Sequence, residues 1–392
     1  MNKRWVCRLL LLVCATIQWA QADDKISYEL GGHLKTRGTL QTFRDDSVIS
    51  TLTGSSAEDL NMELRVLFSA HSGAWDVKAD GQAVIMYGDT VEYTRELSEL
   101  APAYGLLFGR LPEDDRRWWN LTHTIEDRGK RAAIGRLDRL SVGYTGGYTS
   151  LRLGRQAISW GNGLVYTPMD IVNPFDPSQI DTEYKTGDDM LYGQYLRDNG
   201  GDIQATYVVR RNPETGNVES DQATVAAKYH GFAGATEYDL MGARHYGEAV
   251  IGIGAARDLG GAVWRSDLVL SAADDDLVAQ FVINTSYSWT WSGRNISGNA
   301  EYFFNGFGQS DGCYSPDCLA ENPELLERIA RRQLFTLGRH YLGGNLMIEM
   351  TPLFTLTPQL FWNLSDHSAL LQVVTQNSLG DDLVLLGALS LP

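Results

Sequence analysis

The chain has 392 residues, a hydrophobic content of 43% and a net charge of −16. This length allows two or three soluble domains or one large barrel, and we predict one domain because no linker or low-complexity tract divides the sequence. The acidic balance argues against nucleic acid as a partner, because phosphate groups are bound through basic surfaces.

The N-terminus has the pattern of a secretory signal peptide. Three basic residues among the first eight precede a short apolar run, and Ala20-Gln21-Ala22 follows it. The run is too short to cross a bilayer as a helix. We therefore predict a signal peptide over 1–22 and a mature domain over 23–392, with 30 Lys and Arg against 49 Asp and Glu.

A two-residue alternation of apolar and polar side chains runs through most of the remaining chain. In 277–291 the odd positions are mainly apolar and end in aromatics, whereas the even positions are mostly amides and hydroxyls. This alternation is typical of β-strands, whose successive side chains point to opposite faces. We predict seventeen strands near 26–42, 58–71, 74–88, 138–146, 149–159, 190–199, 202–211, 222–232, 235–246, 248–258, 261–273, 276–291, 294–307, 338–350, 353–364, 367–377 and 382–391.

The connections between these strands alternate in length. Short Gly-rich turns alternate with long connections near 43–57, 88–137, 160–189, 211–221 and 307–337. An exported membrane protein without an apolar helical span has to be a closed barrel, and barrels of outer membranes have this loop pattern. We therefore predict an all-β fold, a closed antiparallel transmembrane β-barrel of 16–18 strands with short periplasmic turns. A soluble β-sandwich is the alternative, but it would not sort its long loops to one end.

The alternation also assigns side chains to the lipid or to the interior. A charge that faces lipid near the bilayer midplane costs about 2–4 kcal/mol, so charged residues are expected to face inward. The inward basic residues are Lys35, Arg37, Arg65, Lys78, Arg139, Arg152, Arg210, Lys228 and Arg265. The inward acidic residues are Glu29, Glu63, Asp76, Asp80, Glu237, Asp239, Asp267, Glu301 and Glu349.

This interior is hydrated and balanced in charge, so the net charge of the chain does not indicate a preference for cations. Further basic residues gather in 88–137. Two interpretations stay open: the basic residues guide an anionic solute, or they pair with the acids and brace the wall.

Two cysteines remain after the predicted cleavage. Cys313 and Cys318 lie five residues apart, which in an oxidising compartment predicts a disulfide that closes a loop; no second Cys or His pair supports a metal site. Lipidation at Cys14 is disfavoured because Val13 precedes it. Further on, 322–332 has Pro at the start, an early Glu and late Arg, which predicts a short helix in an external loop or a lid.

The densest unusual stretch is LRLGRQAISWGNG over 151–163, followed by YTPMDIVNPFDP over 166–177. Glycines break the strand and three prolines restrict the backbone, so a loop of defined shape is expected. The stretch resembles outer-membrane barrels of the porin and alginate-export type, in particular a proteobacterial group with Leu-Arg-Leu-Gly-Arg-Gln…Trp-Gly-x-Gly before Asn-Pro-Phe/Leu-Asp-Pro.

The resemblance implies that Arg152, Arg155, Gln156, Trp160 and Asp170 lie at or near a constriction of the pore. The alternative is that Arg155 and Trp160 only pin the turn to the wall. The chain departs from the wider pattern at its last residues, Leu-Ser-Leu-Pro, where an aromatic residue is expected. Either a last strand is missing, or one strand has been split or missed, because bacterial barrels usually have an even number. Pro358 within a strand predicts a bulge or shortened pairing.

These observations predict a porin-like channel in the outer membrane of a Gram-negative bacterium, in contact with membrane lipids. It would pass or export polar or anionic small molecules or polysaccharide. The candidate pore-lining residues are Lys35, Arg37, Arg65, Lys78, Arg152, Arg155, Gln156, Trp160, Asp170, Lys228, Arg265 and Glu301. The main alternative is a barrel that holds a periplasmic or extracellular complex. An enzyme is disfavoured because the seven His are scattered and no hydrolase, metalloprotease or phosphate-loop motif occurs, and no cofactor is expected.

Overall fold

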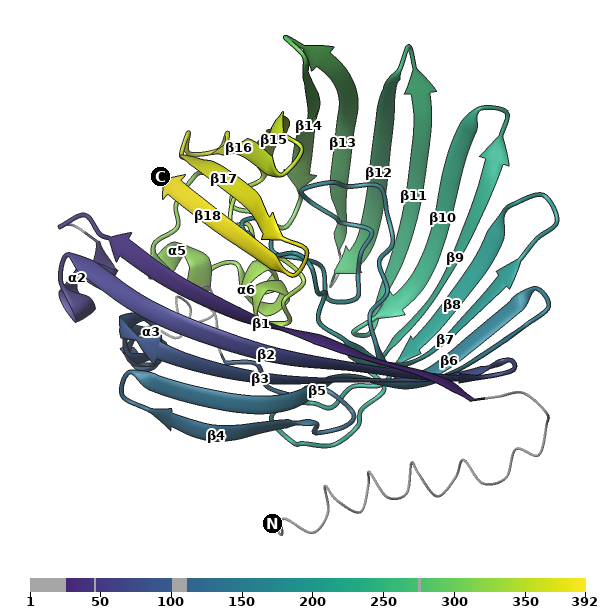
Figure 1. Ribbon diagram of the computed structural model, residues 1–392, viewed down its shortest axis with the longest axis horizontal. Coiled ribbons are helices and arrows are strands. Elements are labelled where there is room, and N and C mark those ends of the chain that lie inside the picture. The colour runs from purple at the N-terminus through teal and green to yellow at the C-terminus, as the bar shows by residue number, and fades with distance from the viewer. Residues whose placement is uncertain (1–25, 46, 101–110, 274–275) are drawn as a thin grey trace.

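The computed structural model describes residues 26–45, 47–100, 111–273 and 276–392, so the predicted signal peptide lies outside the described residues. The described chain forms one antiparallel sheet of 18 strands, which confirms the all-β fold and the predicted strand number (Figure 1). Among the described residues, no helix has the length and the apolar character needed to cross a membrane.

The strands are β1 (Ser27–Thr42), β2 (Ser56–Ser72), β3 (Trp75–Gly88), β4 (Thr122–Arg128), β5 (Arg131–Gly146), β6 (Thr149–Gln156), β7 (Asp188–Leu196), β8 (Asp202–Val208), β9 (Thr224–Ala233), β10 (Thr236–His245), β11 (Glu248–Leu259), β12 (Ala262–Ala273), β13 (Asp276–Trp291), β14 (Arg294–Asn305), β15 (His340–Thr351), β16 (Phe354–Asn363), β17 (Ala369–Gly380) and β18 (Leu383–Leu391). The helices are α2 (Val48–Thr53), α3 (Asp89–Leu100), α5 (Pro316–Ala320) and α6 (Pro323–Ala330).

The strand that the sequence did not indicate is β4. The region 88–137, predicted as one long loop, contains α3, β4 and the first half of β5, so that prediction was wrong. β5 pairs with β3 along one edge, while its other edge pairs first with β4 and then with β6. β4 and β6 therefore follow one another along the same edge, and the wall has seventeen positions although the sheet has 18 strands.

The two faces of the sheet differ in chemistry. On β11 the side chains of Ile251 and Ile253 are more than half exposed on the outer face, whereas Val250 is buried on the inner face. On β12 the buried inward side chains include Asp267, and on β14 they include Glu301. The sheet therefore has an apolar outer surface and a polar inner surface, as the alternation predicted.

The ladder between β15 and β16 is interrupted at Pro358. Pairs are present at Asn345–Gln359 and at Ile348–Leu356, while the two positions between them are unpaired. Proline lacks the N–H that a ladder needs, which explains the interruption. The predicted shortening of the pairing is confirmed.

The sheet curves around two inward segments. Figure 1 shows α5 and α6 on its concave side, together with the chain that connects β6 to β7. The described ladders run without a break from β1 to β18, and a ladder between β1 and β18 is not among those of the described residues. These two inward segments form the site described below.

Because the outer face of the sheet is apolar, a charged substitution on that face should lower the stability of the protein, and more so near the middle of the bilayer. Ile253 lies in the middle of β11, so Ile253→Arg is expected to lower the free energy of unfolding in lipid vesicles by about 2–4 kcal/mol. Leu259, on the same face beside the short turn, is the matched control, and Leu259→Arg should cost only about 0–1 kcal/mol. Urea titration of both variants checks the depth dependence, and equal costs would contradict a membrane-facing surface.

Candidate functional site

The segment 157–187, here called the inner loop, leaves the wall and crosses the interior. β6 ends at Gln156 after 8 residues, and the wall position beyond it is filled by the neighbouring β4 region. Trp160 and Met169 of the inner loop are buried, with exposed fractions of 4% and 0%. Their cluster on the wall consists of Ala226, Met241, Val250 and Val269.

The carboxylate of Glu301 on β14 is the central anchor of the inner loop. It accepts hydrogen bonds from the backbone N–H groups of Leu164, Val165 and Tyr166, at 2.7, 3.1 and 2.6 Å. Asn284 Nδ2 donates to the same carboxylate at 3.1 Å. The side chain of Glu301 is buried, and hydrogen bonds to a charged acceptor are roughly twice as strong as neutral ones. One acidic side chain therefore holds three consecutive backbone amides of the loop on the wall.

A second carboxylate, Asp267 on β12, holds the preceding turn. It accepts from the backbone N of Asn162 at 2.6 Å and from its Nδ2 at 2.7 Å. Gly161 makes this approach possible: its φ is 94°, and a Cβ there would lie 2.8 Å from Asp267 Oδ2. The glycine that appeared in the sequence motif is thus required by the anchor.

Aromatic stacking adds an apolar contact to the Glu301 anchor. The ring of Tyr166 stacks on Phe303 with centroids 4.8 Å apart and also contacts Tyr341 at 5.5 Å. Trp160 Nε1 donates to Gln204 Oε1 on β8 at 2.6 Å. The inner loop is therefore attached to two separate regions of the inner face of the sheet, β8 and the strands β12–β15.

An ion pair inside the inner loop closes it on itself. Lys185 Nζ lies 2.5 Å from Asp170 Oδ2, and both side chains are buried. Burial raises the pKa of Asp170 to about 6 despite the neighbouring ammonium, and burial also lowers the pKa of Lys185. The pair joins the two halves of the loop without relying on the wall.

Arg155 is the most completely buried basic residue of the motif. Its guanidinium binds Asp189 through two hydrogen bonds, at 2.8 and 3.0 Å, and Asp114 at 2.8 Å. Burial opposes ionisation of Asp114, but Arg117 and Arg155 hold its pKa below the ordinary value. Arg155 and Trp160 therefore pin the start of the loop to the wall.

Most of the predicted inward basic residues also have acidic partners. The pairs are Arg65–Asp138 at 3.1 Å, Arg152–Asp76 at 2.9 Å, Arg210–Asp188 at 2.8 Å, Lys228–Asp239 at 3.4 Å and Lys35–Asp181 at 2.7 Å. Arg265 donates to Ser286 Oγ at 3.0 Å, and Arg37 and Lys78 lie on the inward faces of β1 and β3. The wall is therefore braced by charge pairs.

The structure brings only part of the predicted set together. Arg152, Gln156 and Trp160 line one cavity, whereas Arg155, Asp170 and Glu301 are engaged in anchors. The residues spread along the wall are Lys35, Arg37, Arg65, Lys78, Lys228 and Arg265. Several partners in loops were not predicted because no local pattern marks them: Asp114 for Arg155, Asp181 for Lys35 and Lys185 for Asp170.

The segment 306–339, here called the helical lid, is the second inward segment. The disulfide Cys313–Cys318 is present, with the Cα atoms 5.9 Å apart. The predicted helix is α6, capped by Asn322, whose side chain accepts from the backbone N of Leu325. The lid packs through the buried residues Phe307, Leu319, Leu325, Ile329 and Leu334 against Ala273 on β12.

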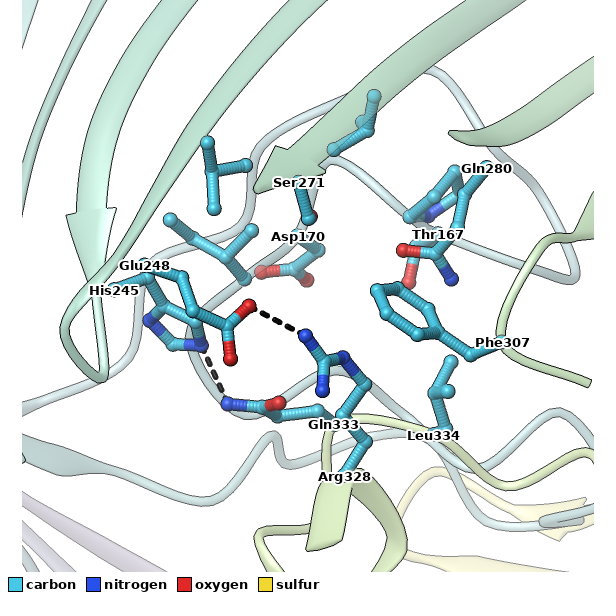
Figure 2. Close-up of a pocket in the computed structure, with 14 residues that line it drawn as sticks. Thr167, Asp170, His245, Glu248, Ser271, Gln280, Phe307, Arg328, Gln333 and Leu334 are labelled. Atoms are coloured by element: carbon cyan, nitrogen blue, oxygen red, sulfur yellow. Dashed lines mark hydrogen bonds and ion pairs between the residues drawn. The ribbon is translucent and has the colours of Figure 1, made fainter. Parts of the chain in front are cut away.

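The inner loop and the lid meet across a small pocket of about 50 Å³ (Figure 2). On the lid side, Arg328 pairs with Glu248, and Gln333 forms a hydrogen bond with His245. Asp170 lies on the opposite side of the pocket. Across the described part of the chain, no group of three or more His, Cys, Asp or Glu side chains is arranged to hold a metal ion.

Among the comparisons with known proteins, only the search of solved structures gave matches. No family model matches the sequence, and no curated protein is similar to it. A mutant of the Rhodopseudomonas blastica porin is 8% identical with a TM-score of 0.45, and the match covers 89% of this chain and 99% of that one. Pseudomonas putida OprB is 9% identical with a TM-score of 0.42, covering 96% of each chain. A likeness at this level does not support a functional inference. The function proposed for this chain rests on its own geometry.

Mutation of Glu301 tests whether this carboxylate holds the inner loop on the wall. Glu301→Ala would leave three loop amides without their acceptor, at about 1–3 kcal/mol for the buried one at Tyr166 and less for the two that are partly buried. We expect the inner loop to detach, so that trypsin cleaves at Lys185 in the folded protein. Glu349→Ala is the matched control, because that inward carboxylate binds Asn295 near the short turns. Equal cleavage in the two variants would contradict the anchoring role.

Proposed function

We propose that this protein is an outer-membrane channel for small polar solutes, with the inner loop as its constriction. The observation that carries the proposal is the inverted chemistry of the sheet, which is apolar outside and charged inside. A soluble protein buries its apolar face, whereas a membrane barrel exposes it to lipid and encloses water. Export would be directed by the signal peptide expected over 1–22.

Aromatic residues support the membrane position. Exposed aromatic side chains gather beside the short turns: Trp75, Tyr144, Tyr148, Tyr195, Phe232, Tyr287, Trp289 and Trp291. Several lie in contact, for example Trp75 with Tyr144 at 5.0 Å. Such residues form girdles where the hydrocarbon core meets the lipid headgroups. The short-turn end would therefore lie at one membrane surface, with the longer connections at the other.

The interior favours small solutes. The inner loop and the lid both occupy space inside the sheet, and the cavities that border the inner loop measure about 310 and 50 Å³. The constriction is held by two buried carboxylates and two aromatic contacts, so it would be a permanent part of the channel.

The pairing of the inward charges bears on which solutes pass. Arg152 and Arg155 contact acidic partners of their own, and Arg65 contacts Glu63 as well as Asp138. Asp138 is shared with two further basic residues, Arg136 and Arg139, so each of these basic residues has an acidic contact. A paired wall offers hydrogen-bonding groups but little net field, which favours polar solutes over strongly anionic ones.

Planar bilayer recordings test the channel. Wild-type protein should give discrete conductance steps with weak ion selectivity, because the inward charges are paired. Glu301→Ala should give larger steps, since it frees the constriction, while Glu349→Ala should match the wild type. Absence of any step would contradict an open channel. A stoichiometric protein that co-purifies with the barrel would instead favour the scaffold function.

A further inference from the structure

A cavity of about 310 Å³ lies between the inner loop and the inward faces of β6, β7 and β8. We call it the vestibule; the residues that matter for its chemistry are Arg152, Gln156, Trp160, Tyr192, Gln194 and Gln204. Strand register makes its wall regular, because Ser150, Gln194 and Gln204 are direct neighbours on three adjacent strands. Arg152 and Tyr192 are paired two residues further along, so they form a second row.

The hydrogen-bonding groups of the vestibule are mostly uncharged amides and hydroxyls. Neighbouring strands lie about 4.8 Å apart, so the row Ser150–Gln194–Gln204 presents donors and acceptors at intervals that span one small ring. The amide of Gln194 offers both a donor and an acceptor, whereas Gln204 already accepts from Trp160 Nε1 and donates to Asp202 Oδ1 at 2.8 Å. A ligand that satisfies this row has to offer both as well, which hydroxyl groups do.

The vestibule has little net charge. Its one ionic lining residue is Arg152, whose Nη2 contacts both oxygens of Asp76, at 3.1 and 2.9 Å. Arg152 Nε is buried and has no hydrogen-bond partner among the described residues. The groups that can meet a ligand are therefore the uncharged ones of the lining, because Arg152 Nε has no surface open to the cavity. Because Asp76 already neutralises the guanidinium, a neutral acceptor fits better than an anion.

Two aromatic side chains complete the lining. Trp160 closes the vestibule toward the constriction, and its ring is held by the hydrogen bond from Nε1 to Gln204. Tyr192 projects from the wall on the inward face of β7. Aromatic rings provide apolar surface for the C–H groups of a ligand, while a few polar groups determine its orientation.

We propose that the vestibule is a binding site for a neutral saccharide of one or two rings. This inference rests on the proposed channel function and names the class of solute that pauses before the constriction. The ring hydroxyls would contact Gln194 and its neighbour Ser150, and the apolar edge of the ring would contact Tyr192.

Calorimetric titration of maltose into the full-length protein tests the site, in a detergent without a sugar headgroup. We expect saturable binding that Gln194→Ala and Tyr192→Leu each weaken by about three- to tenfold, as loss of one neutral hydrogen bond or ring contact would. Gln376→Ala is the matched control, because this glutamine lies on the inward face of β17, in register with Leu386 on β18, and should leave binding unchanged.

Maltose binding and conductance together distinguish the proposed saccharide site from the proposed channel function. Conductance steps without maltose binding would overturn the saccharide site and leave the channel in place. Maltose binding that responds to the Gln194 and Tyr192 variants would support the site even if no conductance appeared. Tighter binding of glucuronate than of glucose would overturn the neutral ligand class, since it would show that the charge of Arg152 is available.

Discussion

The interior of this protein depends on two buried carboxylates that bind the backbone of one loop. Glu301 accepts three consecutive loop amides, and Asp267 accepts two donors from Asn162. A buried carboxylate is costly unless donors surround it, and loop amides are costly unless they find acceptors. Each satisfies the other, so the loop can cross the interior without secondary structure of its own. The Trp160 contact and the vestibule are placed by this arrangement.

The wall obeys a related constraint, since every backbone group within a bilayer needs a partner. Because β4 and β6 share one edge of β5, the wall has an odd number of positions, and β1 and β18 run in the same direction (Figure 1). A direct ladder between them would therefore be parallel, which differs from all the other ladders. β18 also differs in composition: Val384 and Leu386 are apolar on its inward face. The separation of apolar outward and polar inward side chains seen in the other strands is therefore not kept in β18.

The alternation of side chains was sufficient to predict the wall, because each strand carries its own two-residue signal. All seventeen predicted segments correspond to strands, and only β4 was missed. Its sequence, THTIEDR, has one apolar residue, Ile125, and lies within a polar region. The disulfide and α6 could be predicted for the same reason, because the residues that indicate each of them lie close together in the sequence. Each of these predictions needed no knowledge of the fold.

The partners of the inward charges could not be predicted in the same way, because they are distant in sequence. Arg155 binds Asp114, 41 residues away, and Arg65 binds Asp138, 73 residues away. The equal numbers of basic and acidic inward residues, nine of each, are compatible with charges that attract a solute and with charges that attract one another. In the structure many of these charges contact one another, and a guanidinium 2.8 Å from a carboxylate has a reduced field at a distance. In the proposed channel, selection would therefore depend on size and hydrogen bonding, and Gln194 of the vestibule would contribute to the hydrogen bonding.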